Sequence, residues 1–191
     1  MDGMRCWKKL CSNLGRPGLI LLLALTVVSA AQGANAPVPP QEAVQERLLS
    51  FYNIHSGAHL AVIYRRGDHY VPETLAQINH MLCDPFCGAE HEIDPRVLDF
   101  LYDLLEKVDF HGEVHVVCGY RSVETNTMLH NRSSGVALGS MHLQGRALDF
   151  RLPGVDSKYV WETARAMKRG GTGYYKTSNF VHIDSGPVRW W

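Results

Sequence analysis

The sequence predicts an α+β fold in which a small antiparallel sheet is flanked by helices. Segments with apolar residues at helical spacing alternate with shorter segments rich in β-branched and aromatic residues, which is typical of this class. The composition is 46% hydrophobic and 20% charged over 191 residues, so the chain can bury a sizeable core. We find no internal repeat and expect one domain over residues 37–191.

Residues 1–36 have the composition of a signal peptide or N-terminal anchor with a linker. A basic start precedes an uncharged apolar run, and small residues follow, which is the three-part pattern of a secretory signal. Cleavage after Ala31, Ala34 or Ala36 fits the preference for small residues. The apolar run is shorter than the roughly 20 residues of a spanning helix, but an uncleaved anchor stays open. We therefore expect export to the periplasm or cell envelope, with membrane contact only through this segment.

The net charge bears on which partners are expected, and the cysteines bear on disulfide bonds and metal sites. The formal net charge is zero, which gives no reason to expect a nucleic-acid partner. Three cysteines, Cys83, Cys87 and Cys118, lie in the expected mature domain, and disulfides persist in exported proteins. Cys83 and Cys87 are close enough for a small-loop disulfide, with two free thiols as the alternative. No second cysteine pair completes a four-sulfur zinc site.

The first half of the expected domain predicts a β-hairpin and then two helices. Two stretches, LSFYNI and HLAVIY, are rich in strand-forming residues and are separated by HSGA. Residues 71–82 predict a helix, because Pro72 stands near the start and apolar residues recur at helical spacing. Residues 94–108 predict a second helix, with Asp94 as N-cap and Pro95 in the first turn.

The second half predicts further strands and two more helices. Strands are expected at residues 113–120 and 146–152, with one or two more within residues 171–186. Helices are expected at residues 122–131 and 157–170, the latter closed by glycines.

The segment GSMHLQGRALDF places His142 seven residues before Asp149. On one helix the two would lie about 10.5 Å apart along the axis, and Gly145 argues against a continuous helix. A loop that ends at Gly145 and a following strand fit better, because side chains alternate across a strand. Leu148 and Phe150 then face the core, Asp149 stands on the opposite, polar face, and the loop folds His142 over that face.

The segment NFVHIDSG repeats this construction near the C-terminus. Its apolar side chains alternate with His182 and Asp184, which share one strand face. If this strand pairs with the strand of Asp149, then His142, Asp149 and His182 converge into a site with two histidines and one carboxylate. Three protein ligands and one position for water are typical of catalytic zinc, although iron uses the same ligand types.

Five residues, Ser140, His142, Gly145, Ala147 and Asp149, form the motif S-x-H-x-x-G-x-A-x-D. This motif resembles the signature of a group of zinc peptidases that includes lysostaphin, D-Ala-D-Ala carboxypeptidases and the zinc fold of hedgehog signalling domains. Nearly the whole expected domain is similar to the murein endopeptidase K-like branch of this group. The matching stretches are SFYNIHSGAHL, CGYRSVETN, GSMHLQGRALDF and GTGYYKTSNFVHIDSGPVRWW.

The resemblance implies a hedgehog/D-Ala-D-Ala-peptidase-like fold and a Zn²⁺ ion held by His142, Asp149 and His182. It also implies hydrolysis of the cross-link peptides of bacterial peptidoglycan by metal-activated water. A carboxypeptidase that releases a terminal D-amino acid is one alternative. A non-catalytic zinc-containing module that binds peptidoglycan is another, and a secreted domain without metal is a third.

Two residues are candidates for catalysis. Arg121 follows the expected strand at 113–120 and is the candidate cation for the charge of the tetrahedral intermediate; related carboxypeptidases use an arginine in a comparable segment. A structural salt bridge is its alternative role. Asp184 is a candidate general base, or it orients His182. The identity of the base stays open, because many relatives carry Glu or Asp where this chain has Asn179.

Tyr174 and Tyr175 are expected to form a wall of the substrate groove, with Trp190 and Trp191 nearby. Packing in the core or on the surface is the alternative for each. The two tryptophans have a further alternative role, which is to cover the open edge of the sheet.

Overall fold

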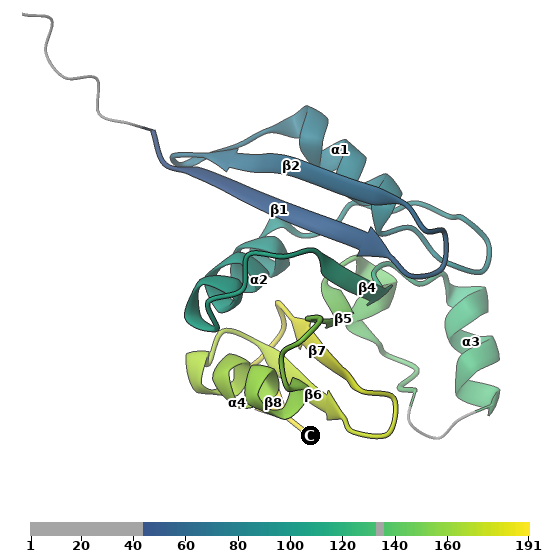
Figure 1. Ribbon diagram of the computed structural model, residues 1–191. Coiled ribbons are helices and arrows are strands. Elements are labelled where there is room, and N and C mark those ends of the chain that lie inside the picture. Colours follow the sequence, from purple (N-terminus) through teal and green to yellow (C-terminus); the bar gives the residue numbers. More distant parts are fainter. Residues whose placement is uncertain (1–43, 133–135) are drawn as a thin grey trace, which may run out of the picture. The chain divides into compact units, whose positions relative to one another are not determined.

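The computed structural model describes residues 44–132 and 136–191, which form a mixed eight-stranded sheet and four α-helices. The strand order across the sheet is β3-β2-β1-β4-β5-β7-β6-β8 (Figure 1). The β1–β4 and β6–β8 pairs are parallel, and the other neighbours are antiparallel. In the described ranges no helix is both long and apolar enough to cross a membrane. The expected leader, residues 1–36, lies outside the described residues.

All of the predicted elements are present, with small shifts at their ends. The strands are β1 Glu46–Asn53, β2 His59–Arg66, β3 His69–Tyr70, β4 Val114–Cys118, β5 Ala147–Arg151, β6 Gly171–Tyr175, β7 Phe180–Asp184 and β8 Arg189–Trp190. The helices are α1 Pro72–Met81, α2 Pro95–Lys107, α3 Val123–Arg132, α4 Ser157–Met167 and the single 3-10 turn η1 Met141–Gln144. Asp94 caps α2 as predicted, because its side chain accepts a hydrogen bond from the Arg96 N–H.

The α+β class is confirmed, but the prediction of a small antiparallel sheet is wrong. The sheet has eight strands and is mixed. The parallel β1–β4 pair is joined by a long connection that contains α1 and α2, as parallel strands require. Local sequence patterns do not show which distant strands pair, and β3 and β8, with two residues each, are too short to give a periodic signal.

The hydrophobic core lies on one face of the sheet, against α1, α2 and α4. α1 contacts β2, α4 contacts β6 and β7, and α2 contacts β1, β7 and α4. Leu148 and Phe150 of β5 and Val181 and Ile183 of β7 are buried in this core, as the alternating pattern predicts. α3 contributes no side chain to the core cluster, and Figure 1 shows it apart from α2 and α4. The opposite face of β5 and β7 is therefore available for polar side chains.

A buried carboxylate ties α2 to the outer strands. Asp99 accepts hydrogen bonds from the hydroxyls of Tyr64 at 2.8 Å and Tyr70 at 2.6 Å, and from the guanidinium groups of Arg65 at 3.0 Å and Arg47 at 3.1 Å. Burial would raise the pKa of Asp99, but the hydrogen bonds from Tyr70, Tyr64 and Arg65 outweigh it and hold the pKa below its usual range.

We expect Asp99→Asn to lower the free energy of unfolding by about 3 kcal/mol at pH 7, because it leaves charged partners unpaired in a buried network. The folded pKa of Asp99 lies below the unfolded value of about 3.9, so the stabilisation is complete above that value and is lost as the pH falls through the folded pKa. Urea denaturation at pH 7 and pH 3 measures both effects. The control is Asp68→Asn, since Asp68 is exposed; equal losses in the two variants would contradict the assignment.

Candidate metal centre

The polar face of β5 and β7 brings two predicted ligands together. The two strands pair antiparallel, with Asp149 directly opposite His182. Each side chain is flanked along its strand by residues that face the core, so both point away from it. The prediction that these strands pair is therefore confirmed. This face is not exposed, however: Asp149 is 6% exposed and His182 is 5% exposed, because loops and the C-terminal residues cover them.

His142 reaches the same place from η1, the short turn before β5. The Ser140 side chain accepts a hydrogen bond from the His142 N–H and caps this turn. Gly145 ends the turn with φ of 61°, a left-handed conformation that favours glycine. A Cβ atom at Gly145 would also collide with the Glu92 carbonyl oxygen. The left-handed backbone conformation and the close packing at this position thus both require glycine. Gly145 thereby sets the direction of the loop that carries His142.

The three predicted ligands place their donor atoms around one point. Asp149 Oδ1 lies 2.7 Å from His182 Nδ1, and Asp149 Oδ2 lies 3.3 Å from His142 Nε2. The two imidazole nitrogens, His142 Nε2 and His182 Nδ1, lie 3.2 Å apart. Donors bound about 2.0–2.1 Å from a tetrahedral zinc ion are roughly 3.3 Å from one another. The spacing of these side chains therefore fits a single small metal ion.

In each imidazole, the outer nitrogen, which points away from Asp149, lies next to a hydrogen-bond acceptor. This contact indicates that the outer nitrogen carries a proton. His142 Nδ1 lies 2.6 Å from the Gly119 carbonyl oxygen, which can only accept, so this nitrogen carries the proton. His182 Nε2 lies 3.0 Å from the carboxylate of Asp184 and is protonated for the same reason. The inner nitrogens, His142 Nε2 and His182 Nδ1, face each other and the Asp149 carboxylate. Positive charge between these atoms, from a proton or from a metal ion, stabilises the arrangement.

The electrostatics of the site favour positive charge at this point. Burial opposes charge on His142 and on Asp149, but the attraction between the two outweighs it. As a result the pKa of His142 is raised to about 10, and that of Asp149 is held well below its usual range. A divalent metal ion carries a larger positive charge than a protonated imidazole, so the same groups would also favour a metal ion at this point.

Arg121 lies beside the three ligands. It is 9% exposed, its Nη2 is 3.9 Å from Asp149 Oδ2, and its Nη1 donates to Asn126 Oδ1 at 3.2 Å. Its Nε is buried and has no partner within the described residues. The guanidinium is therefore held at the edge of the centre without a full set of hydrogen bonds.

Asp184 lies behind His182 and is completely buried. Besides His182 it accepts hydrogen bonds from the backbone N–H of Gly171 and Gly186 and from Arg189, whose Nη2 is 2.7 Å away. Burial would raise the pKa of Asp184, but the bonds from His182 and Arg189 outweigh it and hold the pKa far below its usual range. Asn179 is remote from this cluster, since its side chain accepts a hydrogen bond from Ser157 at the start of α4.

The two predicted substrate-binding tyrosines lie on opposite faces of β6, because neighbouring residues of a strand alternate. Tyr175 lines the cavity at the metal centre, and its hydroxyl accepts a hydrogen bond from Trp191 Nε1 at 3.1 Å. Tyr174 instead stacks on Trp161 of α4 with ring centroids 5.9 Å apart and is not among the residues that line this cavity. Trp191 packs on the His182 ring at 5.1 Å, whereas Trp190 belongs to the edge strand β8 and is exposed.

Sequence reasoning missed Cys118. Simple alternation places its side chain in the core with Val114 and Val116, but the β4–β5 register shifts between Val116 and Cys118. This irregularity directs the Cys118 sulfur towards His142 and Asp149, within 4.8 Å of their ligand atoms. In the sequence, the feature that could have pointed to Cys118 is its position three residues before the candidate catalytic residue Arg121. All three described cysteines are free thiols, so Cys83 and Cys87 form no disulfide.

Cavities open on two sides of the metal centre. One, of about 370 Å³, is lined by His142, His182, Tyr175 and Trp191. The other, of about 180 Å³, is lined by Cys118 and by apolar side chains of α3 and of the loop after α1. Arg121, Asp149 and Phe180 border both cavities. The two cavities therefore adjoin at the metal centre.

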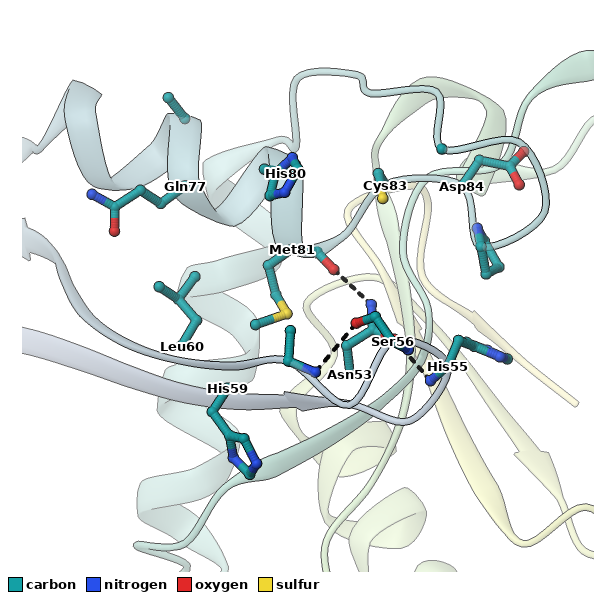
Figure 2. A pocket seen from close by; sticks show the side chains of 14 residues that line it. Asn53, His55, Ser56, His59, Leu60, Gln77, His80, Met81, Cys83 and Asp84 are labelled. Carbon is teal, nitrogen blue, oxygen red and sulfur yellow. Dashed lines mark hydrogen bonds between the residues drawn. The ribbon is translucent and has the colours of Figure 1, made fainter.

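A third cavity, of about 730 Å³, lies between the β1–β2 turn, α1 and the loop after it. Figure 2 shows the imidazoles of His55, His59 and His80 on separate sides of it, so they do not converge on one point. The Asn53 side chain, which lines this cavity, donates a hydrogen bond to the Met81 carbonyl oxygen and accepts hydrogen bonds from backbone N–H groups of the turn. His55 borders both this cavity and the 180 Å³ cavity, so the two adjoin. This large cavity has no cluster of ligands comparable to the metal centre.

Comparisons with known proteins agree with this geometry. The family model described as peptidoglycan L,D-endopeptidase MepK matches residues 41–191. The peptidoglycan L,D-endopeptidase MepK of Escherichia coli is 40% identical over 145 residues, which cover 76% of this chain and 80% of that protein. The probable peptidoglycan L,D-endopeptidase MepK of Haemophilus influenzae is 38% identical over 146 residues, or 76% of this chain and 78% of that protein. No solved structure matches the chain.

We expect Gly145→Ala to lower the free energy of unfolding by about 3 kcal/mol and to weaken metal binding, because it adds backbone strain and a collision with Glu92. Thermal unfolding and metal titration measure the two effects. Gly154→Ala is the matched control: Gly154 also has a positive φ, but a Cβ there meets nothing within 4 Å. It should cost only about 1 kcal/mol and leave metal binding intact. Similar metal affinity in both variants would argue against the role given to Gly145.

Proposed function

We infer the function from one premise: the chain belongs to the family of the peptidoglycan L,D-endopeptidase MepK, whose model spans residues 41–191. The protein is therefore a hydrolase, a metallopeptidase that cleaves peptide bonds in bacterial peptidoglycan. The non-catalytic module and the metal-free domain, which the sequence left open, are set aside on this ground.

The metal is proposed to be zinc, held by His142 Nε2, the Asp149 carboxylate and His182 Nδ1. The observation that carries this proposal is the convergence of two imidazole nitrogens, 3.2 Å apart, with a carboxylate that contacts both. Three protein ligands of these types leave one coordination position open, which is the arrangement of catalytic zinc. When bound, zinc supplies a nucleophile, because it lowers the pKa of water from about 15.7 to near 7, and it polarises the scissile carbonyl.

Arg121 is assigned to the charge of the tetrahedral intermediate. Its guanidinium is buried, borders both cavities and retains an Nε without a partner among the described residues. A fixed cation in a site that excludes water stabilises developing negative charge more strongly than one in solvent. Tyr175 lines the same cavity, where its hydroxyl could hydrogen-bond the substrate.

Asp184 is assigned to the orientation of His182 rather than to proton abstraction. Its carboxylate is fully buried, is engaged by four hydrogen-bonding groups and lines neither cavity of the metal centre. By holding the proton on His182 Nε2 it keeps the lone pair of Nδ1 directed at the ion. Among the described residues of the two cavities, Asp149 is the one carboxylate, so no separate carboxylate base is assigned.

The cavities on both sides of the metal centre favour an endopeptidase over a carboxypeptidase. A carboxypeptidase needs a cation for the free carboxylate of its substrate. The other guanidinium that lines the 370 Å³ cavity, Arg189, is already paired with Asp184 at 2.7 Å. An open passage without a free terminal cation suits an internal peptide bond.

The proposed substrate is a 3–3 cross-link of peptidoglycan. The relatives are L,D-endopeptidases by name, and in a 3–3 cross-link the carbonyl comes from an L centre and the amine from a D centre. A 4–3 cross-link has a D-alanine carbonyl instead. This substrate lies outside the cytoplasmic membrane, so we propose that residues 1–36 direct export to the periplasm.

We expect the protein to hydrolyse purified 3–3 cross-linked muropeptides at least tenfold faster than 4–3 cross-linked ones, because the two differ in configuration at the scissile carbonyl. Mass spectrometry of the products measures both rates. Chelator and His142→Ala should each abolish cleavage, and added zinc should restore only the chelated protein. Intact 3–3 cross-links after incubation with zinc-loaded protein would refute the proposal.

We expect Asp184→Asn to weaken zinc binding by roughly 10–100-fold, because both oxygens of Asp184 accept hydrogen bonds and an amide NH2 group in place of one of them would face donors. Competition with a chromophoric chelator measures the affinity. Asp99→Asn, which also removes a buried carboxylate but lies outside the centre, is the control and should bind zinc normally. If Asp184→Asn binds zinc as tightly as the wild type but hydrolyses more slowly, Asp184 acts as a base instead.

A further inference from the structure

Cys118 ends β4 at the metal centre. Its Sγ and the ligand atoms of His142 and Asp149 all lie within 4.8 Å of one another. This group shares His142 and Asp149 with the proposed ligand set of His142, Asp149 and His182. The side chain is 8% exposed and lines the 180 Å³ cavity, so its sulfur faces the centre rather than bulk solvent.

The β-bulge at this end of β4 is what turns the sulfur towards the ligands. Cys118 pairs with Asp149 across β4 and β5, and the register shifts between Val116 and Cys118. Without the bulge the side chain would follow Val114 and Val116 into the hydrophobic core. The backbone irregularity thus adds a fourth group of metal-ligating type to the site.

Arg121 supplies a second, independent feature at the sulfur. Its Nη2 donates to Cys118 Sγ at 3.5 Å and lies 3.9 Å from Asp149 Oδ2. Arg121 is 9% exposed as a residue, and its Nε has no partner within the described part of the chain. Positive charge with unsatisfied hydrogen-bonding capacity therefore stands where a thiolate would lie.

We propose that Cys118 binds the metal through Sγ as a fourth protein ligand, beside His142, Asp149 and His182. This inference rests on the proposed metal centre and deepens it. A zinc–sulfur bond is about 2.3 Å, so sulfur and nitrogen donors of a tetrahedral site are roughly 3.6 Å apart. The ligand atoms of Cys118, His142 and Asp149 lie within 4.8 Å of one another, so the proposal requires the sulfur to move closer on metal binding by about 1 Å at most. On binding, the thiol releases its proton to solvent, and the sulfur takes the coordination position that water otherwise occupies.

The consequence is a closed resting form of the enzyme. Zinc sites with four protein ligands are structural, whereas catalytic sites keep one position open. In the closed form Cys118 occupies the open position and also engages Nη2 of Arg121. Hydrolysis then requires the sulfur to leave, which frees both the coordination position and the guanidinium. The same thiolate that limits activity would retain the ion when substrate is absent.

Cobalt substitution tests the sulfur ligand directly. The full chain carries Cys6→Ser, Cys11→Ser, Cys83→Ser and Cys87→Ser, so that Cys118 is the remaining thiol. With one equivalent of Co²⁺ this protein should show the near-ultraviolet charge-transfer band of a thiolate–cobalt bond. Adding Cys118→Ser should abolish that band, keep the visible bands of bound Co²⁺, and weaken affinity by at least about tenfold. Bound cobalt without a charge-transfer band, or a band that survives Cys118→Ser, would overturn the inference.

A second measurement covers the case in which Cys118→Ser does not fold. In the protein that retains only Cys118, one equivalent of Zn²⁺ should slow alkylation by iodoacetamide at least about tenfold, since a coordinated sulfur is a poor nucleophile. An unchanged alkylation rate with zinc bound counts against the inference. The variant His142→Ala distinguishes failure of the proposed metal centre from failure of the proposed Cys118 ligand. If that variant loses cobalt while the parent binds it without a sulfur band, the metal centre stands and the Cys118 inference fails; a parent that binds no metal refutes both.

Discussion

The close approach of His142 Nε2, His182 Nδ1 and the Asp149 carboxylate is the arrangement on which the rest of this structure depends. The two nitrogens are 3.2 Å apart, and the outer nitrogen of each ring lies against an acceptor, the Gly119 carbonyl for His142 and Asp184 for His182. Such a cluster is unfavourable in a buried site unless positive charge lies at its centre. Folding therefore builds a site that takes up positive charge, either as a proton on His142 or, as proposed above, as a metal ion whose binding would stabilise the fold.

Several ordinary structural elements hold this unfavourable cluster in place. The β5–β7 pairing fixes Asp149 opposite His182, while Leu148, Phe150, Val181 and Ile183 anchor the same strands in the core. At the end of β7, Ser185 donates to Asp94, the N-cap of α2, at 2.7 Å, and Arg146 donates to the Ser185 carbonyl oxygen at 2.8 Å. The ligands thus sit on strands that are tied to the first turn of a helix. Preorganisation of this kind is what keeps donor atoms within a few tenths of an ångström of a usable geometry.

The centre also shows how one backbone irregularity changes the chemistry of a site. The bulge in β4 turns Cys118 from the core towards the ligands, and Arg121, three residues later, contacts both the sulfur and Asp149. Arg121, the cation proposed to stabilise the intermediate of peptide hydrolysis, is therefore also in contact with the sulfur. It borders both cavities at the centre, together with Asp149 and Phe180.

The sequence alone predicted the helices, most strands and the three side chains, His142, Asp149 and His182, that the structure brings together, because each depends on local spacing. A loop ending at Gly145, a period of two around Asp149 and the same period around His182 were sufficient. Tertiary structure decided what depends on contacts between distant segments. It set the parallel β1–β4 pair, the place of Tyr174 against α4, the burial of Asp184 behind His182, and the turn of Cys118 into the site. The physical reason is that periodicity assigns a side chain to a face, whereas pairing partners, bulges and the layer that covers a face are fixed only when remote residues pack together.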